Sequence, residues 1–175
     1  VVQLPGPTGL AVVTVDSEGE NTVVVVPGAN AGVTADHVHG WADLIGAAEL
    51  VVSQGELSAH ATAAVADAVT GPWLLNLAPV IDLDPRVIRR ADPLVVNEHE
   101  AALVLRQFGV TPPTAPVALV QALLAEGVAS AVLTLGAAGA IVGDGHAVTQ
   151  VPSPRVRAVD TVGAGDAFCG ALAAR

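Results

Sequence analysis

The sequence contains no lysine and no methionine, and only one cysteine among its 175 residues. The single cysteine, Cys169, excludes a disulfide within the chain and is typical of a reducing compartment. Its apolar neighbours predict a small core residue. Because the formal net charge is -10, we expect no binding to nucleic acid or to an anionic membrane. Any phosphate that the protein binds must therefore be held by backbone N–H groups, arginines or a metal ion.

Long apolar runs and aromatic residues are also scarce. No apolar run reaches the roughly 18 residues that a membrane-spanning helix needs, and we expect a soluble cytoplasmic protein. Aromatic residues make up 2% of the chain, whereas hydrophobic residues make up 52%, so valine, leucine and alanine must fill the core. This composition suits parallel strands that are buried on both faces by helices, and the length suits one domain.

The two ends of the sequence lack the usual boundary signals. The chain starts at Val1, and its last residues, 167–175, form a predicted helix that no glycine cap or proline follows. This pattern predicts a fragment of a longer protein.

The pattern of the chain changes near residue 30. Residues 10–15 and 21–26 alternate as two strands of a hairpin around the turn 16–20. After residue 33, strands and helices alternate with short links, which predicts a mainly parallel sheet under helices. The predicted helices are 34–48, 57–69, 98–108, 116–126 and 167–175. The predicted strands are 50–53, 73–77, 94–96, 131–135, 140–142 and 146–151, with 155–159 leading as a strand into the last motif.

Ligands of such sheets bind beyond the carboxyl ends of the strands, so the loop after Val159 is informative. Its Gly-Ala-Gly turn, 163–165, lets backbone N–H groups approach an anion at the start of a helix. Asp166 follows in the first turn, where a carboxylate could take a proton from a hydroxyl that attacks a phosphate. The alternative is that Asp160 or Thr161 caps the helix and Asp166 only complements its dipole.

Three further loops contain candidate residues. Asn97 and Glu100 could serve a magnesium nucleotide, but their spacing also fits a capping box. The backbone near Gly136 could accept a nucleotide, or Gly136 and Gly139 could simply form a tight turn into the next hairpin. Glu56 follows the strand 50–53, where a lone acid could also be a solvated cap.

Together these four loops resemble the ribokinase/PfkB family of carbohydrate kinases. The run 159–168, Val-Asp-Thr-Val-Gly-Ala-Gly-Asp-Ala-Phe, is similar to the C-terminal signature of the family. Residues 97–100 match its Asn-x-x-Glu motif, and residues 134–136 match its nucleotide-side turn. The order and separations agree over essentially the whole chain, and residues 19–21 and 27–31 are most similar to the ribokinase branch.

The resemblance implies a doubly wound α/β fold and an ATP-dependent kinase that phosphorylates the 5-hydroxyl of ribose. Asp166 would be the catalytic base and would contact the sugar. The N–H groups around Gly163, Ala164 and Gly165 would form an anion hole for the transferring phosphoryl group. Glu56 would be the acid near the ribose.

The resemblance also implies a nucleotide site and two cations. Glu100 would hold Mg²⁺ through water, and Asp160 with the Val162 carbonyl would form part of a K⁺ site. The implied ATP-binding residues are Asn97, Thr134, Gly136 and Gly139.

The resemblance divides the chain into two parts. Residues 1–30 would be part of a β lid that closes over the sugar and forms a homodimer contact, and residues 31–175 would be an incomplete catalytic core. The family's Asn-x-Asp sugar pair, its Gly-Gly-Lys turn and its final segments are missing. These departures predict that the 175 residues alone fold poorly and phosphorylate little.

Three other functions are alternatives to this kinase. A different sugar or nucleoside kinase of the same family would differ mainly in sugar contacts outside this chain. A kinase-like module that only binds nucleotide or sugar would gain nothing from Asp166 beside a phosphate. A Rossmann dehydrogenase would need its glycines after the first strand, whereas here they come last.

Overall fold

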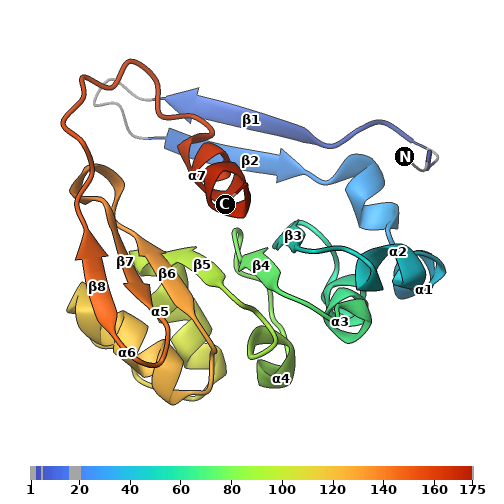
Figure 1. Ribbon diagram of the computed structural model, residues 1–175. Coiled ribbons are helices and arrows are strands. Elements are labelled where there is room, and N and C mark those ends of the chain that lie inside the picture. The colour runs from blue at the N-terminus through green and yellow to red at the C-terminus, as the bar shows by residue number, and fades with distance from the viewer. Residues whose placement is uncertain (1–2, 5, 16–20, 175) are drawn as a thin grey trace.

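The computed structural model describes residues 3–4, 6–15 and 21–174, which form a small hairpin and a larger sheet covered by helices (Figure 1). In the hairpin, β1 (Leu10–Val15) pairs antiparallel with β2 (Asn21–Val26). The predicted strands 10–15 and 21–26 are confirmed, whereas the predicted turn 16–20 lies outside the described residues.

The larger sheet has six strands in the order in which they occur along the chain. They are β3 (Val51–Gln54), β4 (Trp73–Asn76), β5 (Leu94–Asn97), β6 (Ala131–Thr134), β7 (Ala140–Gly143) and β8 (Val148–Val151). The first four are parallel, and β7 and β8 continue the sheet as an antiparallel pair. The predicted α/β class with a mainly parallel sheet is therefore confirmed.

The helices follow the predicted alternation with two differences. They are η1 (Gly28–Gly32), α1 (Ala35–Gly40), α2 (Ala42–Gly46), α3 (Ala59–Ala68), α4 (Pro85–Ile88), α5 (Glu98–Gln107), α6 (Pro116–Ala125), η2 (Gly136–Ala138) and α7 (Ala164–Ala173). The predicted helix 34–48 is broken at Trp41, whose backbone leaves the helical region. The short helix α4 was not predicted, although Asp84 caps it and Pro85 begins it.

The predicted strand 155–159 is wrong. These residues form no strand, and Val159 is 97% exposed. A strand needs a neighbour to satisfy its backbone groups, and this segment runs outside the sheet between β8 and α7 (Figure 1).

The alternation of side chains along the strands divides the core between the two faces of the sheet. On the first face, residues such as Trp73, Leu94 and Leu133 belong to one large cluster with the buried sides of α3, α5 and α6. On the second face, a small cluster contains Leu74, Val95, Val132, Ala140 and Cys169, the last of which comes from α7. The second face is thus covered at its centre by α7.

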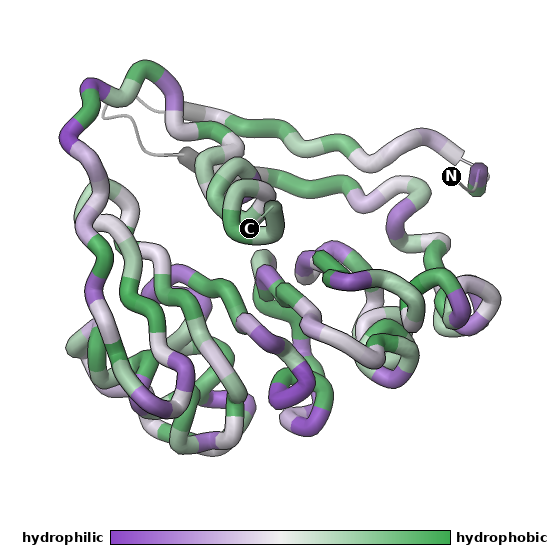
Figure 2. The backbone as a smooth tube through the Cα atoms, in the orientation of Figure 1, coloured by the Kyte–Doolittle hydropathy of each residue, from purple (hydrophilic) through white to green (hydrophobic). Residues whose placement is uncertain are grey.

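The hairpin lies beyond the edge of the large sheet where the parallel strands end, and α7 lies beneath it (Figure 1). Its strands are mostly hydrophobic (Figure 2), yet large side chains are exposed on both faces. Leu10, Val12, Val24 and Val26 are each about half exposed on one face, and Val13 and Val25 are 38% and 48% exposed on the other. None of the helices that the structure describes has the length and apolar character needed to span a bilayer.

Candidate active site

The four parallel strands of the large sheet each end on a polar residue. These residues are Gln54, Asn76, Asn97 and Thr134. Gln54 lies opposite Asn76 and Asn97 lies opposite Thr134, so they form a polar row along the carboxyl edge. Gln54 and Asn76 were not among the residues predicted from the sequence. The recurrence of a polar residue at the end of each apolar strand would have indicated them.

Helix α7 begins at this edge with a left-handed glycine. Gly163 is its N-cap with φ 72, and no side chain caps the helix. The alternative that Asp160 or Thr161 caps α7 is therefore wrong: the Asp160 carboxylate accepts the Val162 N–H (2.8 Å), and the Thr161 carbonyl accepts the Ala164 N–H (3.1 Å). The backbone N–H groups in the first turn of a helix have no carbonyl acceptor within that helix. Those at the start of α7 can therefore donate to a bound anion.

The Asp166 carboxylate lies between this turn and the end of β3. Its Oδ1 accepts a hydrogen bond from Gln54 Nε2 at 2.7 Å. Its Oδ2 faces Gly163, because a Cβ built on that glycine would lie 3.9 Å from this oxygen. The Asp166 side chain is exposed. The carboxylate is therefore accessible from solvent and directed toward the glycine turn.

Asn97 and Glu100 form the capping box that their spacing indicated. Asn97 Oδ1 accepts the Glu100 N–H (2.9 Å), and Glu100 Oε2 accepts the Asn97 N–H (2.7 Å). Because Oδ1 is directed into the helix, the amide nitrogen of Asn97 is the part of the side chain that can meet a ligand. Burial raises the pKa of Glu100, against the lowering effects of the Asn97 N–H and the nearby His99. The capping role is thus observed, and it leaves one amide and one carboxylate oxygen for further contacts.

Cys169 of α7 belongs to the same buried cluster as Val95 of β5 and Val132 of β6. Its thiol is buried, and its pKa is raised by that burial and then by the charges of Asp166 and Glu100. Because Val95 lies two residues before Asn97 on β5, this packing sets α7 over the strand that leads into the Asn97 loop.

The two glycines after β6 differ in their surroundings. Gly136 has φ 55, and a Cβ built there would meet no atom within 4 Å, so its backbone is open to a ligand. Gly139 has φ 99, and a Cβ there would lie 2.0 Å from the Val151 carbonyl oxygen. The turn at Gly139 is thus required by packing against the end of β8, whereas Thr134 and Gly136 lie at the open edge.

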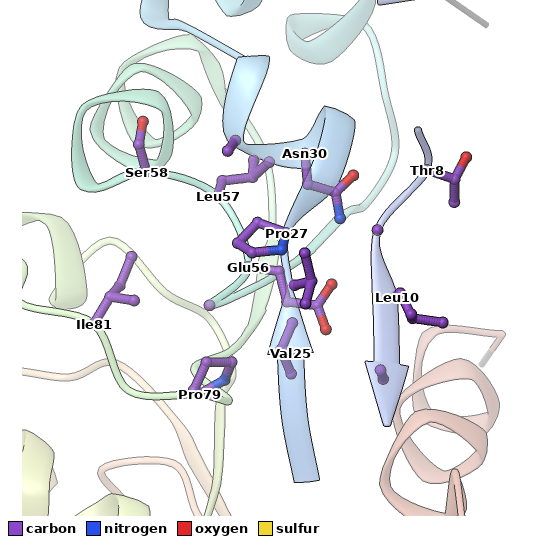
Figure 3. A pocket seen from close by; sticks show the side chains of 15 residues that line it. Thr8, Leu10, Val25, Pro27, Asn30, Glu56, Leu57, Ser58, Pro79 and Ile81 are labelled. Atoms are coloured by element: carbon purple, nitrogen blue, oxygen red, sulfur yellow. The ribbon is translucent and has the colours of Figure 1, made fainter. Parts of the chain in front are cut away.

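Glu56 lines a cavity of about 540 Å³ between the hairpin and the core. The walls come from the hairpin and η1, from the β3–α3 loop, and from the loop after β4. Figure 3 shows the Glu56 carboxylate directed toward the hairpin strands, with Asn30 of η1 also lining the space. Asp166 does not line this cavity, but its partner Gln54 is only two residues from Glu56.

Comparison with known proteins identifies the family of this chain. The sequence model described as "pfkB family carbohydrate kinase" matches residues 1–175. The chain belongs to the pfkB family of carbohydrate kinases. A ribokinase from Mus musculus is 36% identical over 175 residues, which cover 95% of this chain and 53% of that protein. The resemblance to this family that the sequence motifs indicated is confirmed.

Two solved ribokinase structures resemble the present one. The crystal structure of a ribokinase from Thermotoga maritima superposes with a TM-score of 0.86 at 28% identity, covering 98% of this chain and 57% of the other. A ribokinase from Arabidopsis thaliana, solved with ribose and ATP, has a TM-score of 0.76 at 28% identity and covers 97% and 56%. The chain thus spans about half the length of the relatives that it matches.

Proposed function

We propose that this chain forms most of the catalytic half of an ATP-dependent sugar kinase that phosphorylates the 5-hydroxyl of D-ribose. The observation that carries the proposal is the exposed Asp166 carboxylate beside the glycine turn at the start of α7. Support for the sugar comes from pfkB relatives that are named ribokinases. The described residues offer no cluster of three or more metal-ligating side chains.

In this proposal Asp166 acts as the general base. It would accept the proton of the sugar hydroxyl, and the hydroxyl oxygen would attack the γ-phosphorus atom of ATP. The amides of Gly163, Ala164 and Gly165 would face the negative charge on the phosphoryl oxygens. Ala164 would have to exchange its bond to the Thr161 carbonyl for the phosphate, whereas Gly165 would not.

The neighbouring loops would hold the nucleotide. The amide nitrogen of Asn97 would donate to a phosphate oxygen, and Thr134 and the open backbone at Gly136 would line the ATP site, with Gly139 fixing that turn. Glu100 fits a Mg²⁺ ion held through water, since Mg²⁺ keeps several waters and needs few carboxylates. Bound Mg²⁺ would neutralise charge on the ATP phosphates.

A monovalent cation would fit beside the turn. The Asp160 carboxylate is exposed and fixes the turn through the Val162 N–H. Its second oxygen and the Val162 carbonyl are oxygen donors of the kind that K⁺ accepts. We propose that they form part of a K⁺ site whose charge would tune the potential at the anion hole.

The hairpin would close over the sugar. We propose that residues 1–30 form a lid and residues 31–175 the core, with the sugar in or near the cavity that Glu56 lines. Glu56 would accept hydrogen bonds from sugar hydroxyls. The half-exposed valines of β1 and β2 would pair with the lid of a second copy in a homodimer.

The experiment that tests the proposal is Asp166→Asn in the complete gene product that contains this chain. Ribose-dependent ADP formation should fall about 10²–10⁴-fold, while ATP affinity is largely kept. Asp67→Asn, on the exposed side of α3, is the matched control and should keep the parent rate. A fully active Asp166→Asn enzyme, or one that loses only ATP binding, would contradict the assigned role.

A substrate panel decides the sugar. Ribose should give the highest kcat/KM, above 2-deoxyribose, fructose, ketose phosphates and nucleosides. A preference for another of these would make the protein a different kinase of the same family. Binding of ATP and sugar without turnover, by a folded protein, would instead indicate a non-catalytic binding module.

A further inference from the structure

A side-chain hydrogen bond joins the large sheet to α7, and its donor is not one of the predicted site residues. Gln54 Nε2 donates to Asp166 Oδ1 at 2.7 Å, although the two residues are 112 positions apart in the sequence. We propose that Gln54 is a positioning residue that holds the Asp166 carboxylate in the orientation for proton transfer. The inference rests on the proposed function, because it assigns Gln54 a role in the same reaction.

The strand end that carries Gln54 is rigid. Gln54 is the last residue of β3 and lies opposite Asn76 of β4. The next residue, Gly55, is buried and donates its N–H to the Ala78 carbonyl at 3.2 Å. A Cβ on Gly55 would lie 1.8 Å from the Pro79 carbonyl oxygen, so the chain is pressed against the neighbouring loop. The side-chain amide of Gln54 therefore extends from a closely packed segment of backbone.

Asp166 is on a less constrained element. It lies in the first turn of α7, and the segment that leads into this helix forms no strand and is largely exposed. Gln54 and Val52 are on the same face of β3, which is the face that α7 covers. The hydrogen bond thus connects the Asp166 carboxylate to the sheet. The backbone that leads into Asp166 has few contacts of its own.

The bond also assigns different tasks to the two carboxylate oxygens. Oδ1 is held by Gln54, and Oδ2 is the oxygen that faces Gly163 and the amide turn. A neutral amide donor orients a carboxylate without cancelling its charge, whereas a lysine would pair with it and a glutamate would repel it. Glutamine therefore suits this position, because the base must keep its negative charge and present one oxygen to the hydroxyl.

The same turn links the base to the cavity. Gly55 and Glu56 line the cavity between hairpin and core, and Gln54 precedes them directly. The end of β3 and the residues after it therefore form part of the wall of the proposed sugar site and also orient the Asp166 carboxylate. Since a displacement of about 1 Å can cost about 100-fold in rate, loss of this contact should reduce turnover more than binding.

The test compares Gln54→Met and Gln54→Glu in the complete gene product. Methionine keeps the length of the side chain but removes the donor, and glutamate replaces the donor with a second carboxylate. Gln54→Met should lower kcat about 10- to 100-fold, with the KM values for ribose and ATP within about threefold of the parent. Gln54→Glu should lower kcat further. The control is Gln121→Met on the exposed side of α6, which should leave the kinetic constants unchanged.

A double-variant cycle separates positioning from general support of the fold. If Gln54 acts through Asp166, then adding Gln54→Met to Asp166→Asn should not lower the residual rate further. An additional 10-fold loss in that background would overturn the proposal, as would a Gln54→Met enzyme with the parent kcat. The proposal would also be overturned if both Gln54 variants melted at temperatures so low that unfolding of the enzyme explained the lost rate. Full activity of Asp166→Asn alone would instead remove the proposed function.

Discussion

The two faces of the six-stranded sheet differ in how they are covered. On the first face, α3, α5 and α6 pack on the strands, and the central side chains are inaccessible. On the second face, α7 covers only the centre. Toward the edges of that face Val52 is 48%, Val142 37% and Val151 51% exposed.

The difference places most of the buried apolar surface on one side of the sheet and the proposed catalytic residue on the other. The first face buries most of the apolar surface, which is the main favourable contribution to folding. The second face carries the helix with Asp166, and the first-turn residues of this helix are exposed. Substitutions on the two faces should therefore affect unfolding and activity to different degrees.

The largest expected effect on stability comes from the first face. Trp73 is fully buried and donates its indole N–H to Ser53 Oγ at 2.8 Å. Trp73→Ala should lower the free energy of unfolding by about 3–5 kcal/mol, measured by urea denaturation. Trp41→Ala, at the partly exposed break between α1 and α2, is the control and should cost clearly less. Equal losses of unfolding free energy in the two variants would mean that packing on the first face does not dominate the stability of the fold.

The next effect concerns Gly55, at the edge where the second face meets the cavity. Gly55→Ala would place a Cβ 1.8 Å from the Pro79 carbonyl oxygen and must move backbone, which should cost about 1–3 kcal/mol and most of the activity. At Gly71 the nearest atoms to a built Cβ are 3.8 Å away, so Gly71→Ala should change little. Melting temperature and steady-state kinetics check both, and a Gly55→Ala enzyme like the parent would show that this strand end is not rigid.

A matched pair tests the coverage of the second face directly. Val132 and Val142 are neighbours in register, and they are 3% and 37% exposed. Val132→Ala should cost about 1–2 kcal/mol, whereas Val142→Ala should stay within about 0.5 kcal/mol. Denaturation midpoints measure both. Similar costs would mean that α7 contributes little to covering this face.

The smallest expected effect depends on pH. Burial raises the pKa of Glu100 in the folded state. The stability that protonated Glu100 contributes is therefore fully present below the pKa that Glu100 has in the unfolded chain, and it is lost as the pH rises through its pKa in the folded state. Glu100→Gln should remove this decline, since glutamine can still accept the Asn97 N–H. The measurement is the urea midpoint of parent and variant from pH 4 to 7, and parallel curves would contradict the expectation.

Local signals account for most of the predicted fold. Alternating apolar residues predicted the two hairpin strands, and the later alternation of strands and helices predicted a mainly parallel sheet. Both signals can be read locally because the periodicity of side chains follows directly from backbone geometry. The helix predicted over 34–48 was wrong at Trp41, where the break depends on how the flanking segments pack. The strand predicted over 155–159 failed because its apolar residues have no neighbouring strand.

The candidate site was predictable where a motif is contiguous and not where it is assembled. The glycine turn with Asp166 and the pair Asn97 and Glu100 each lie within a few residues, so their local geometry could be read from spacing. The contact between Gln54 and Asp166 joins distant positions. No local pattern indicates such a pairing.

The sequence alone determined the class of fold, the family resemblance and which loops contain charged and glycine residues, because these depend on composition and short-range order. Only the tertiary structure decided that the first turn of α7 lies beside the end of β3, and that α7 covers the centre of one face. The reason is that packing of an amphipathic helix on a sheet is chosen by surfaces from many segments at once.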